Sequence, residues 1–171
     1  MGFEQITGPN SIAPTPPTGD ISNRVATTAF ISSAISVALS TSVFYPSLTV
    51  LTNSLSSDHL VNNVSNYFDG PTVTQGTSGT WYASGEITVQ DTAGAAGFNI
   101  RLWDGTSVIA SARQSTSGAG NNLQFAISGV ITSPASNIRI SVQDVTSTNG
   151  KIIFNASGNS KDCTITVIRI A

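Results

Sequence analysis

The chain has 171 residues, a formal net charge of -2, and charged side chains at only 9% of its positions, against roughly 25% in an average globular protein. Hydrophobic residues make up 39%, which argues against disorder, and the weak negative charge gives no reason to expect nucleic acid or an anionic membrane as a partner. This length allows one domain with a sizeable core. Such a low charge favours a surface that is partly buried against other copies of the chain.

Prolines crowd the first segment, residues 1–19. Pro9, Pro14, Pro16 and Pro17 each fix φ and remove a backbone donor, which favours an extended backbone that builds no core of its own. The segment is either a disordered tail or a strap laid on another protein. We interpret it as an attachment arm and its prolines as the attachment residues.

A helix is predicted over residues 20–44. Asp20 is a favourable N-cap, and no helix breaker follows before Pro46. Apolar side chains are spread around the helical wheel, so such a helix has to be buried from several sides. Packing against symmetry-related copies is the simplest solution, and a helix laid across the following domain is the alternative. The residues expected to mediate oligomerisation are Ile21, Val25, Phe30, Ile31, Ile35 and Leu39.

The most apolar stretch of the chain is short. Residues 29–44 are interrupted by five serines and a threonine, and a membrane-spanning helix needs about 20 predominantly apolar residues. We therefore expect no insertion into a membrane.

The third segment, residues 45–171, has the period of two that is typical of half-buried strands. Residues 80–90 and 98–103 show it most clearly. Asp104–Gly105 and Asn149–Gly150 are predicted as two-residue hairpin turns, because such dipeptides tolerate positive φ. We expect about eight to ten short antiparallel strands, arranged as a β-sandwich or jelly roll.

Groups suited to catalysis or metal binding are sparse in this segment. Glu86 and Asp91 lie near a strand end, but nothing in the sequence brings their carboxylates to the separation that glycosidic chemistry requires. Cys163, the single cysteine, lies in a β-branched stretch and is expected to be a small buried side chain. His59 has no second His or Cys nearby, so it is not expected to bind a metal. We expect no enzymatic activity and no cofactor.

Hydroxyl, amide and aromatic side chains remain as candidates for binding. Aromatic stacking combined with amide hydrogen bonds holds sugars without charge. Tyr67, Tyr82 and Trp103 are therefore the candidates for contact with a glycan or receptor, with core or subunit packing as the alternative for Trp103. The loops whose composition leaves them freest for recognition are residues 91–97, 114–122, 144–150 and 156–162.

Residues 14–31 read PTPPTGDISNRVATTAFI. This stretch resembles a segment of tailed-bacteriophage and prophage fibre proteins, in which a Pro-rich stretch and a Gly-Asp turn lead into an Ile/Val-Ala-Thr-Thr-Ala-Phe helix. The match covers about a tenth of the chain. In fibres the segment lies between modules or near the end that attaches to the virion. The resemblance therefore implies that residues 1–19 contact other virion proteins.

The segment from Tyr67 onward is similar to the trimeric jelly-roll heads of the complement and tumour-necrosis-factor type. The features that carry this likeness are residues 67–70, residues 79–85 and a hydrophobic last strand that reaches the C-terminus. The resemblance implies a homotrimer of jelly-roll heads.

These observations predict a bacteriophage virion protein that is assembled in the bacterial cytoplasm. It would be a homotrimeric short fibre or spike with an arm at residues 1–19, an oligomerisation helix at 20–44 and a head at 45–171 that contacts host-surface polysaccharide. A capsid decoration protein, of the cement or head-fibre type, is the first alternative. A carbohydrate-binding module is the second. The sequence contains almost nothing that distinguishes a fibre from a decoration protein.

Overall fold

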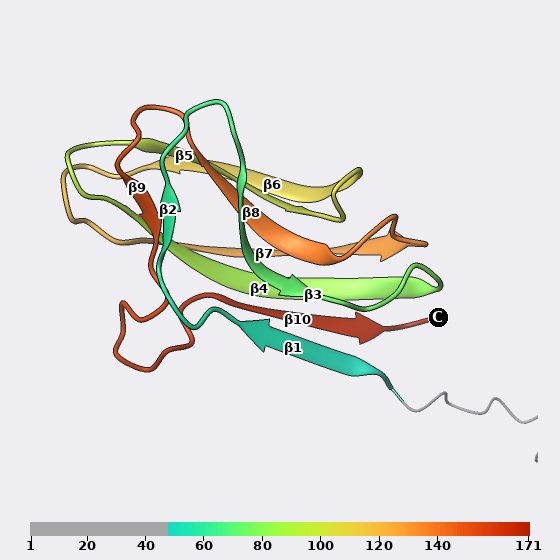
Figure 1. Cartoon of the computed structure of the whole chain (residues 1–171). Helices are drawn as coiled ribbons and strands as arrows, with labels where there is room; N and C mark the ends of the chain where they lie inside the picture. The colour runs from blue at the N-terminus through green and yellow to red at the C-terminus, as the bar shows by residue number, and fades with distance from the viewer. Residues whose placement is uncertain (1–47) are drawn as a thin grey trace, which may run out of the picture. The chain divides into compact units, whose positions relative to one another are not determined.

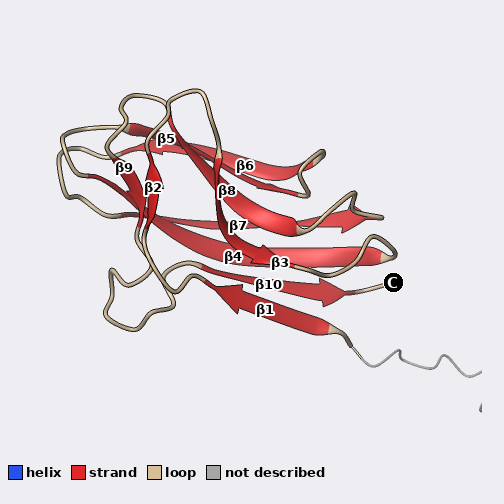
Figure 2. Ribbon diagram, in the orientation of Figure 1, coloured by secondary structure: helices blue, strands red, loops and turns tan. Residues whose placement is uncertain are grey.

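The computed structural model describes residues 48–171. The predicted arm, residues 1–19, and the predicted helix, residues 20–44, lie outside the described residues. Within 48–171 the chain forms ten strands and no helix (Figures 1 and 2). These residues accordingly contain no helical segment with the length and apolarity to cross a membrane.

The strands pair in two antiparallel sheets, which form the two layers of a sandwich (Figure 1). In sheet A, β7 pairs with one edge of the long strand β4, while β10 and then β9 pair along its other edge. Outside these, β1 pairs with β10 and β2 with β9. Sheet B has the order β3–β8–β5–β6. The strands are β1 (Val50–Ser54), β2 (His59–Val61), β3 (Phe68–Val73), β4 (Thr80–Asp91), β5 (Gly97–Trp103), β6 (Val108–Ser115), β7 (Leu123–Thr132), β8 (Ile138–Asp144), β9 (Gly150–Ile152) and β10 (Thr164–Arg169).

The strand order is that of a jelly roll. When the two three-residue strands β2 and β9 are left aside, the first, eighth, third and sixth of the remaining strands lie side by side in sheet A. The second, seventh, fourth and fifth form sheet B. This is the arrangement of two Greek keys folded into a sandwich. The prediction of a mainly β, antiparallel sandwich is confirmed for residues 48–171, whereas the trimer stays a prediction.

Period-two alternation places the core between the sheets. In β4, Trp81, Ala83, Ile87 and Val89 are all buried. Their counterparts from sheet B have no exposed surface, and each such Phe, Leu, Ile or Val contributes about 1.5–3 kcal/mol by leaving water. These counterparts are Phe98, Ile100, Leu102, Ile138, Ile140 and Val142.

The predicted turn at Asp104–Gly105 is longer than a two-residue hairpin. The connection between β5 and β6 spans residues 104–107. The Asp104 carboxylate accepts hydrogen bonds from the backbone N–H groups of Thr106 and Ser107, at 2.9 and 2.6 Å. Gly105 has the positive φ that was expected, +94°. The side chain of the aspartate organises a wider turn than the dipeptide alone predicts.

The prediction of a hairpin turn at Asn149–Gly150 is wrong. The two strands that it would join, β8 and β9, lie in different sheets. Gly150 instead belongs to β9, where a Cβ atom would come within 2.9 Å of Oδ2 of Asp144 and 3.1 Å of Cε1 of Phe98. Glycine is required there by the close approach of the two layers rather than by a turn conformation.

The described residues begin and end at the same end of the sandwich, where the backbone N–H of Arg169 donates to the carbonyl of Thr49 at 3.0 Å. The loops 92–96, 116–122 and 145–149 meet at the opposite end (Figure 1). They are joined there by backbone hydrogen bonds, with Gly120 N donating to the carbonyl of Asp91 and Thr92 N to that of Asn149. Three of the four loops predicted to be free for recognition are thus neighbours in space.

Candidate functional site

A cluster of aromatic and arginine side chains lies on the outer face of sheet B. The Cζ atom of Arg101 is 3.7 Å from the centre of the Tyr67 ring and 3.3 Å from the centre of the Trp103 ring. Cζ of Arg139 lies 4.8 Å from the Trp103 ring centre. Such cation–π contacts hold a guanidinium in a defined place. The aromatic–arginine cluster consists of Tyr67, Asp69, Arg101, Trp103, Arg139 and Ser141.

Strand alternation and register together build this cluster. In β5 the residues between the core positions point outward, which puts Arg101 and Trp103 on one face. Pairing with β8 sets Ser141 beside Arg101 and Arg139 beside Trp103. Pairing of β3 with β8 then brings Asp69 beside Ser141.

A short chain of hydrogen bonds fixes the tryptophan. Nε1 of Trp103 donates to Oγ of Ser141 at 2.6 Å, and that hydroxyl donates to Oδ1 of Asp69 at 2.6 Å. Ser141 is completely buried beneath the cluster. Because each donor has an acceptor, the indole ring is held in one orientation, and the guanidinium groups rest on a rigid surface.

The two arginines differ in their partners. Nε of Arg139 lies 3.3 Å from Oδ1 of Asp69, an ion pair that falls short of an aligned hydrogen bond. Within residues 48–171, no carboxylate pairs with Arg101, and its buried Nε has no hydrogen-bond partner. Burial lowers the pKa of Arg101 below its ordinary value, while the charges of Tyr67 and Asp69 act in the opposite direction. The guanidinium remains charged at neutral pH.

The structure brings together two of the three residues predicted to contact a glycan. Tyr67 and Trp103 meet across Arg101, whereas Tyr82 lies on β4 in the other sheet. Neither arginine of the cluster is among the binding residues predicted from the sequence. Alternation alone could have placed Arg101 next to Trp103 on an outward face, but the position of Arg139 depends on the pairing of β5 with β8.

The outer face of sheet A has a different character. Its register places Val130, Tyr82, Ile168 and Val50 side by side on four neighbouring strands. Val130 is 55% exposed, Val50 51% and Tyr82 38%. We call these four side chains the apolar row. A continuous row of this kind on a sheet surface is typical of a contact surface rather than of scattered exposed residues.

Hydroxyl side chains dominate next to the apolar row. The following rung consists of residues 128, 84, 166 and 52, all of them Ser or Thr. In the rung beyond it, Glu86 is the one charged side chain, and its Oε2 accepts a hydrogen bond from Gln124 at 3.0 Å. The outer face of sheet A therefore combines an apolar row with a nearly uncharged hydroxyl surface.

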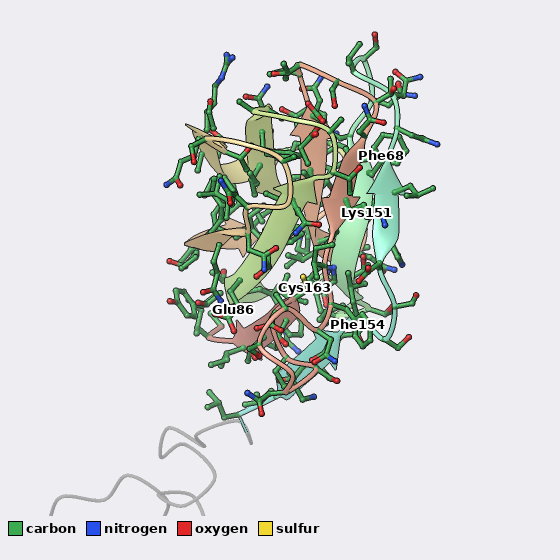
Figure 3. All side chains as sticks on the ribbon, turned by 90° about the vertical axis from the view of Figure 1, so that its left-hand side faces the viewer. Phe68, Glu86, Lys151, Phe154 and Cys163 are labelled. Carbon is green, nitrogen blue, oxygen red and sulfur yellow. The ribbon has the colours of Figure 1, made fainter. Side chains whose placement is uncertain are left out.

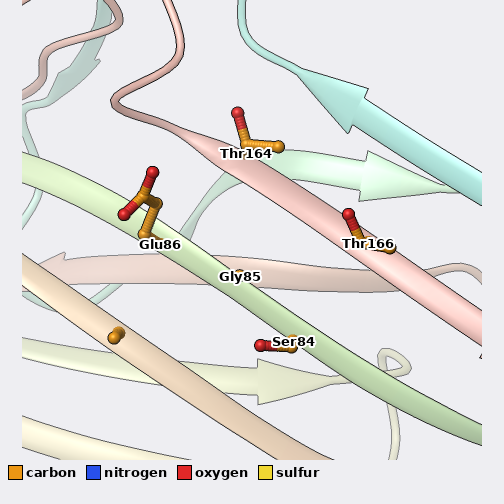
Figure 4. A pocket seen from close by; sticks show the side chains of 6 residues that line it. Ser84, Gly85, Glu86, Thr164 and Thr166 are labelled. Atoms are coloured by element: carbon orange, nitrogen blue, oxygen red, sulfur yellow. The ribbon is translucent and has the colours of Figure 1, made fainter.

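A shallow depression of about 290 Å³ lies in this hydroxyl surface. Figure 4 shows Glu86, Thr164 and Thr166 on the neighbouring strands β4 and β10. Asp91, the possible acid–base partner of Glu86, is buried at the end of β4, on the opposite side of the sheet. The two carboxylates therefore do not meet in this depression. Within residues 48–171, no group of three or more His, Cys, Asp or Glu side chains is placed to hold a metal.

Buried aspartates organise the loops. Asp91 accepts hydrogen bonds from the Ser147 hydroxyl and from the backbone N–H groups of Ala93 and Gly94. Burial by itself raises the pKa of this carboxyl, but these hydrogen bonds outweigh it and the pKa is lowered. The same balance lowers the pKa of Asp104, whose carboxylate accepts three backbone hydrogen bonds. Both aspartates are therefore structural anions.

Cys163 lies inside the sandwich, as Figure 3 shows from one end. Its Sγ lies 3.2 Å from the carbonyl oxygen of Ile153 and accepts a hydrogen bond from the backbone N–H of Thr88 at 3.4 Å. Burial raises the pKa of the thiol to about 11, so it stays protonated at neutral pH and is a poor nucleophile. The prediction of a small buried side chain is confirmed.

The predicted attachment and oligomerisation residues lie outside the described residues, and their roles stay predictions. They are Pro9, Pro14, Pro16 and Pro17 of the arm, and Ile21, Val25, Phe30, Ile31, Ile35 and Leu39 of the helix.

No protein-family model matches the chain, and no curated protein matches it. Among solved structures, latent dimeric PorU from Porphyromonas gingivalis is similar over 71% of this chain at 11% identity and a TM-score of 0.48, but the match spans only 12% of the PorU chain. The C-terminal CBM6 of the laminarinase LamC from Zobellia galactanivorans matches over 71% of this chain and 100% of its own, at 14% identity and a TM-score of 0.37. The vertex protein P5 of PRD1 matches over 72% of this chain and 96% of its own, at 14% identity and a TM-score of 0.35. At these scores none of the likenesses assigns a function to this chain.

Proposed function

We propose that the chain is a structural subunit of a bacteriophage particle, a homotrimeric short fibre or spike that is anchored through its N-terminal residues and meets the host surface with its head. The resemblance of residues 14–31 to a segment of phage fibre proteins supports a location in a phage particle. The outer face of sheet A is the observation that supports the association of several copies of the chain. The proposal assigns no catalytic step and no cofactor to the protein.

The apolar row supports contact between copies. Val50, Tyr82, Ile168 and Val130 form an uninterrupted line across four strands, beside hydroxyl groups that carry no charge. Burying this surface in a contact between copies removes apolar area from water, which contributes about 25 cal/mol per Å², and leaves no charge without a partner. Three copies around one axis would cover the row in every subunit.

The two ends of the head suit a projecting protein. Residue 48, where the described chain begins, lies at the end opposite the loops 92–96, 116–122 and 145–149. An anchor in the residues before 48 would be joined to the head at the end opposite those loops. Loops held on a rigid sandwich are the usual carriers of recognition.

Light scattering on the purified full chain tests the assembly. We expect the mass of a trimer, and a stable monomer at micromolar concentration would contradict the proposal. The same measurement on residues 48–171 separates the contribution of the head from that of residues 1–47. If only the full chain forms a trimer, the apolar row is not the subunit contact.

Electron microscopy of the intact particle, labelled with an antibody to the head, tests the location. We expect the label on projecting fibres or spikes. Label spread evenly over the capsid shell would contradict a fibre and indicate a capsid decoration protein. A monomer that binds a glycan and is absent from particles would instead indicate a carbohydrate-binding module.

A further inference from the structure

We infer that the aromatic–arginine cluster on sheet B binds a singly charged oxyanion of an acidic saccharide, with Arg101 as its principal contact. This inference rests on the proposed function, because it specifies what kind of saccharide the head would meet at a cell surface. Charge would hold the saccharide here, rather than the uncharged aromatic stacking that residue types alone predict.

Arg101 is held in place and yet has its donors free. Both neighbouring rings approach its guanidinium, with Cζ 3.7 Å from the Tyr67 ring centre and 3.3 Å from that of Trp103. No residue between 48 and 171 accepts a hydrogen bond from it or pairs with it as a carboxylate. A guanidinium with its faces stacked and its edge unused presents a planar fork of N–H donors, which matches a carboxylate or phosphate group.

The cost of this arrangement points to a missing acceptor. Nε of Arg101 is buried and unpartnered, and a buried donor without an acceptor destabilises the folded protein. If packing were its only role, an apolar side chain between the two rings would avoid this cost. The buried Nε is closed to a ligand, but the Nη atoms of Arg101 are not among the buried unpartnered atoms, so a ligand oxygen at that edge would give the guanidinium an acceptor.

The charge of the cluster fits one anion. Arg101 and Arg139 contribute two positive charges, and Asp69, which lies beside Arg139, contributes one negative charge. One positive charge remains, so one monoanionic group neutralises the cluster. A neutral sugar ring would use the Trp103 face, but Arg101 already lies against that ring. Recognition at this site therefore relies on charge more than on stacking.

The cluster remains accessible in the proposed trimer. It lies on the outer face of sheet B, and the apolar row lies on the outer face of sheet A. The two layers of the sandwich separate these faces (Figure 1). A subunit can therefore use one face for its neighbours and the other for a ligand.

Titration calorimetry of the full-length protein at low ionic strength tests the inference. The probes are an oligogalacturonate with carboxylate groups, a polysaccharide whose sugars are joined by phosphodiester groups, and neutral dextran. Arg101→Gln removes the charge and the fork, while Arg101→Lys keeps only the charge. Arg113→Gln is the matched control, because it removes one arginine from the same outer face, where Arg113 is exposed and contacts no aromatic ring in the described structure.

We expect the wild-type protein to bind one or both anionic polymers, more weakly as NaCl is added, and not to bind dextran. Arg101→Gln should weaken binding by about tenfold or more and Arg101→Lys by several-fold, because charged hydrogen bonds are lost. Arg113→Gln should retain most of the affinity. The polymer that binds identifies carboxylate or phosphodiester as the natural anion.

Binding of neither anionic polymer would overturn the inference. So would an equal loss in Arg101→Gln and Arg113→Gln, which would indicate nonspecific attraction. Thermal melting and light scattering on each variant separate these results from unfolding and from loss of the trimer. A trimer on the particle that does not bind acidic saccharides would contradict the inference but not the proposed function. A monomer that binds them through Arg101 would support the inference and contradict the proposed function.

Discussion

The two outer faces of the sandwich arise from the same alternation but carry opposite chemistry. Sheet A presents the apolar row and hydroxyl groups with Glu86 as the one charge in the neighbouring rungs. Sheet B presents three of the seven basic side chains of the whole sequence, Arg101, Arg113 and Arg139. On the outer face of sheet A, the strand pairing of β9 with β4 places one basic residue, Lys151, so the basic side chains of the described strands are concentrated on sheet B. The difference separates a face that gains free energy when it is buried from one that loses it.

Energetics explain why the two faces would take different partners. Burying Val50, Tyr82 and Val130, which are 38–55% exposed, releases water from apolar surface and leaves no charge without a partner. Burying Arg101 against another protein subunit would require a matching anion, because an unpaired charge in an interface costs about 3–5 kcal/mol. Copies of the chain should therefore meet through sheet A and anionic ligands through sheet B.

The largest effect is expected from a charge placed in the apolar row. Val130→Glu should weaken self-association by about a hundredfold or more, since each subunit would bury an unpaired carboxylate. Sedimentation or light scattering as a function of protein concentration measures this change.

Val108→Glu is the matched control for this charge. Val108 is also 55% exposed but begins β6, at the edge of sheet B. Val108→Glu should leave the oligomer intact, because substitution of an exposed residue outside a contact changes the free energy of unfolding by about 0.5 kcal/mol or less. If both variants dissociate equally, or if neither does, sheet A is not the subunit contact.

An intermediate effect is expected from a turn that both faces depend on. Asp104→Ala removes the acceptor for three backbone N–H groups, including that of Ala135 at 2.7 Å. The free energy of unfolding should fall by about 3 kcal/mol, as measured by urea denaturation at a fixed protein concentration. Both self-association and ligand binding should weaken together.

Asp58→Ala is the control for that turn. Asp58 is exposed and accepts a backbone hydrogen bond from Phe154 at 3.1 Å, so its removal should cost less than about 1 kcal/mol. Equal destabilisation by both variants would mean that the Asp104 carboxylate does not organise the connection from β5 to β6.

A smaller effect is expected from acid. The pKa values of Asp91 and Asp104 are lowered in the folded protein from the ordinary 3.8. Their contribution to stability is therefore complete above about pH 4 and is lost as the pH falls through the lowered values. Near neutral pH these two groups should not change the urea concentration at the unfolding midpoint. When the pH falls below about 4, that concentration should decrease.

The double variant Asp91→Asn/Asp104→Asn identifies the groups behind the acid effect. It should flatten the pH dependence between about pH 4 and pH 2, because neither amide titrates. An unchanged acid profile in this variant would assign the loss of stability to other carboxylates.

Local chemistry predicted much of the fold and less of the site. Strands were predicted where alternation is strong, as in β4, and the burial of Cys163 followed from its β-branched neighbours. The turn at Asn149–Gly150 was predicted wrongly, because an Asn-Gly dipeptide carries no information about whether its flanking strands share a sheet. Tyr67 and Trp103 were candidates from residue type alone, but the arginine between them was not.

Which side chains face inward and which face outward can be read from the residues of each strand, because a period of two is a property of each strand alone. Residues 14–31, whose sequence resembles a segment of phage fibre proteins, lie outside the described residues. Which outward side chains become neighbours depends instead on how the strands pair. Arg101 and Arg139 are far apart in sequence and meet at Trp103 because β8 pairs with β5. The apolar row likewise exists only because β1, β10, β4 and β7 align in one register, and strand register is a property of the whole sheet.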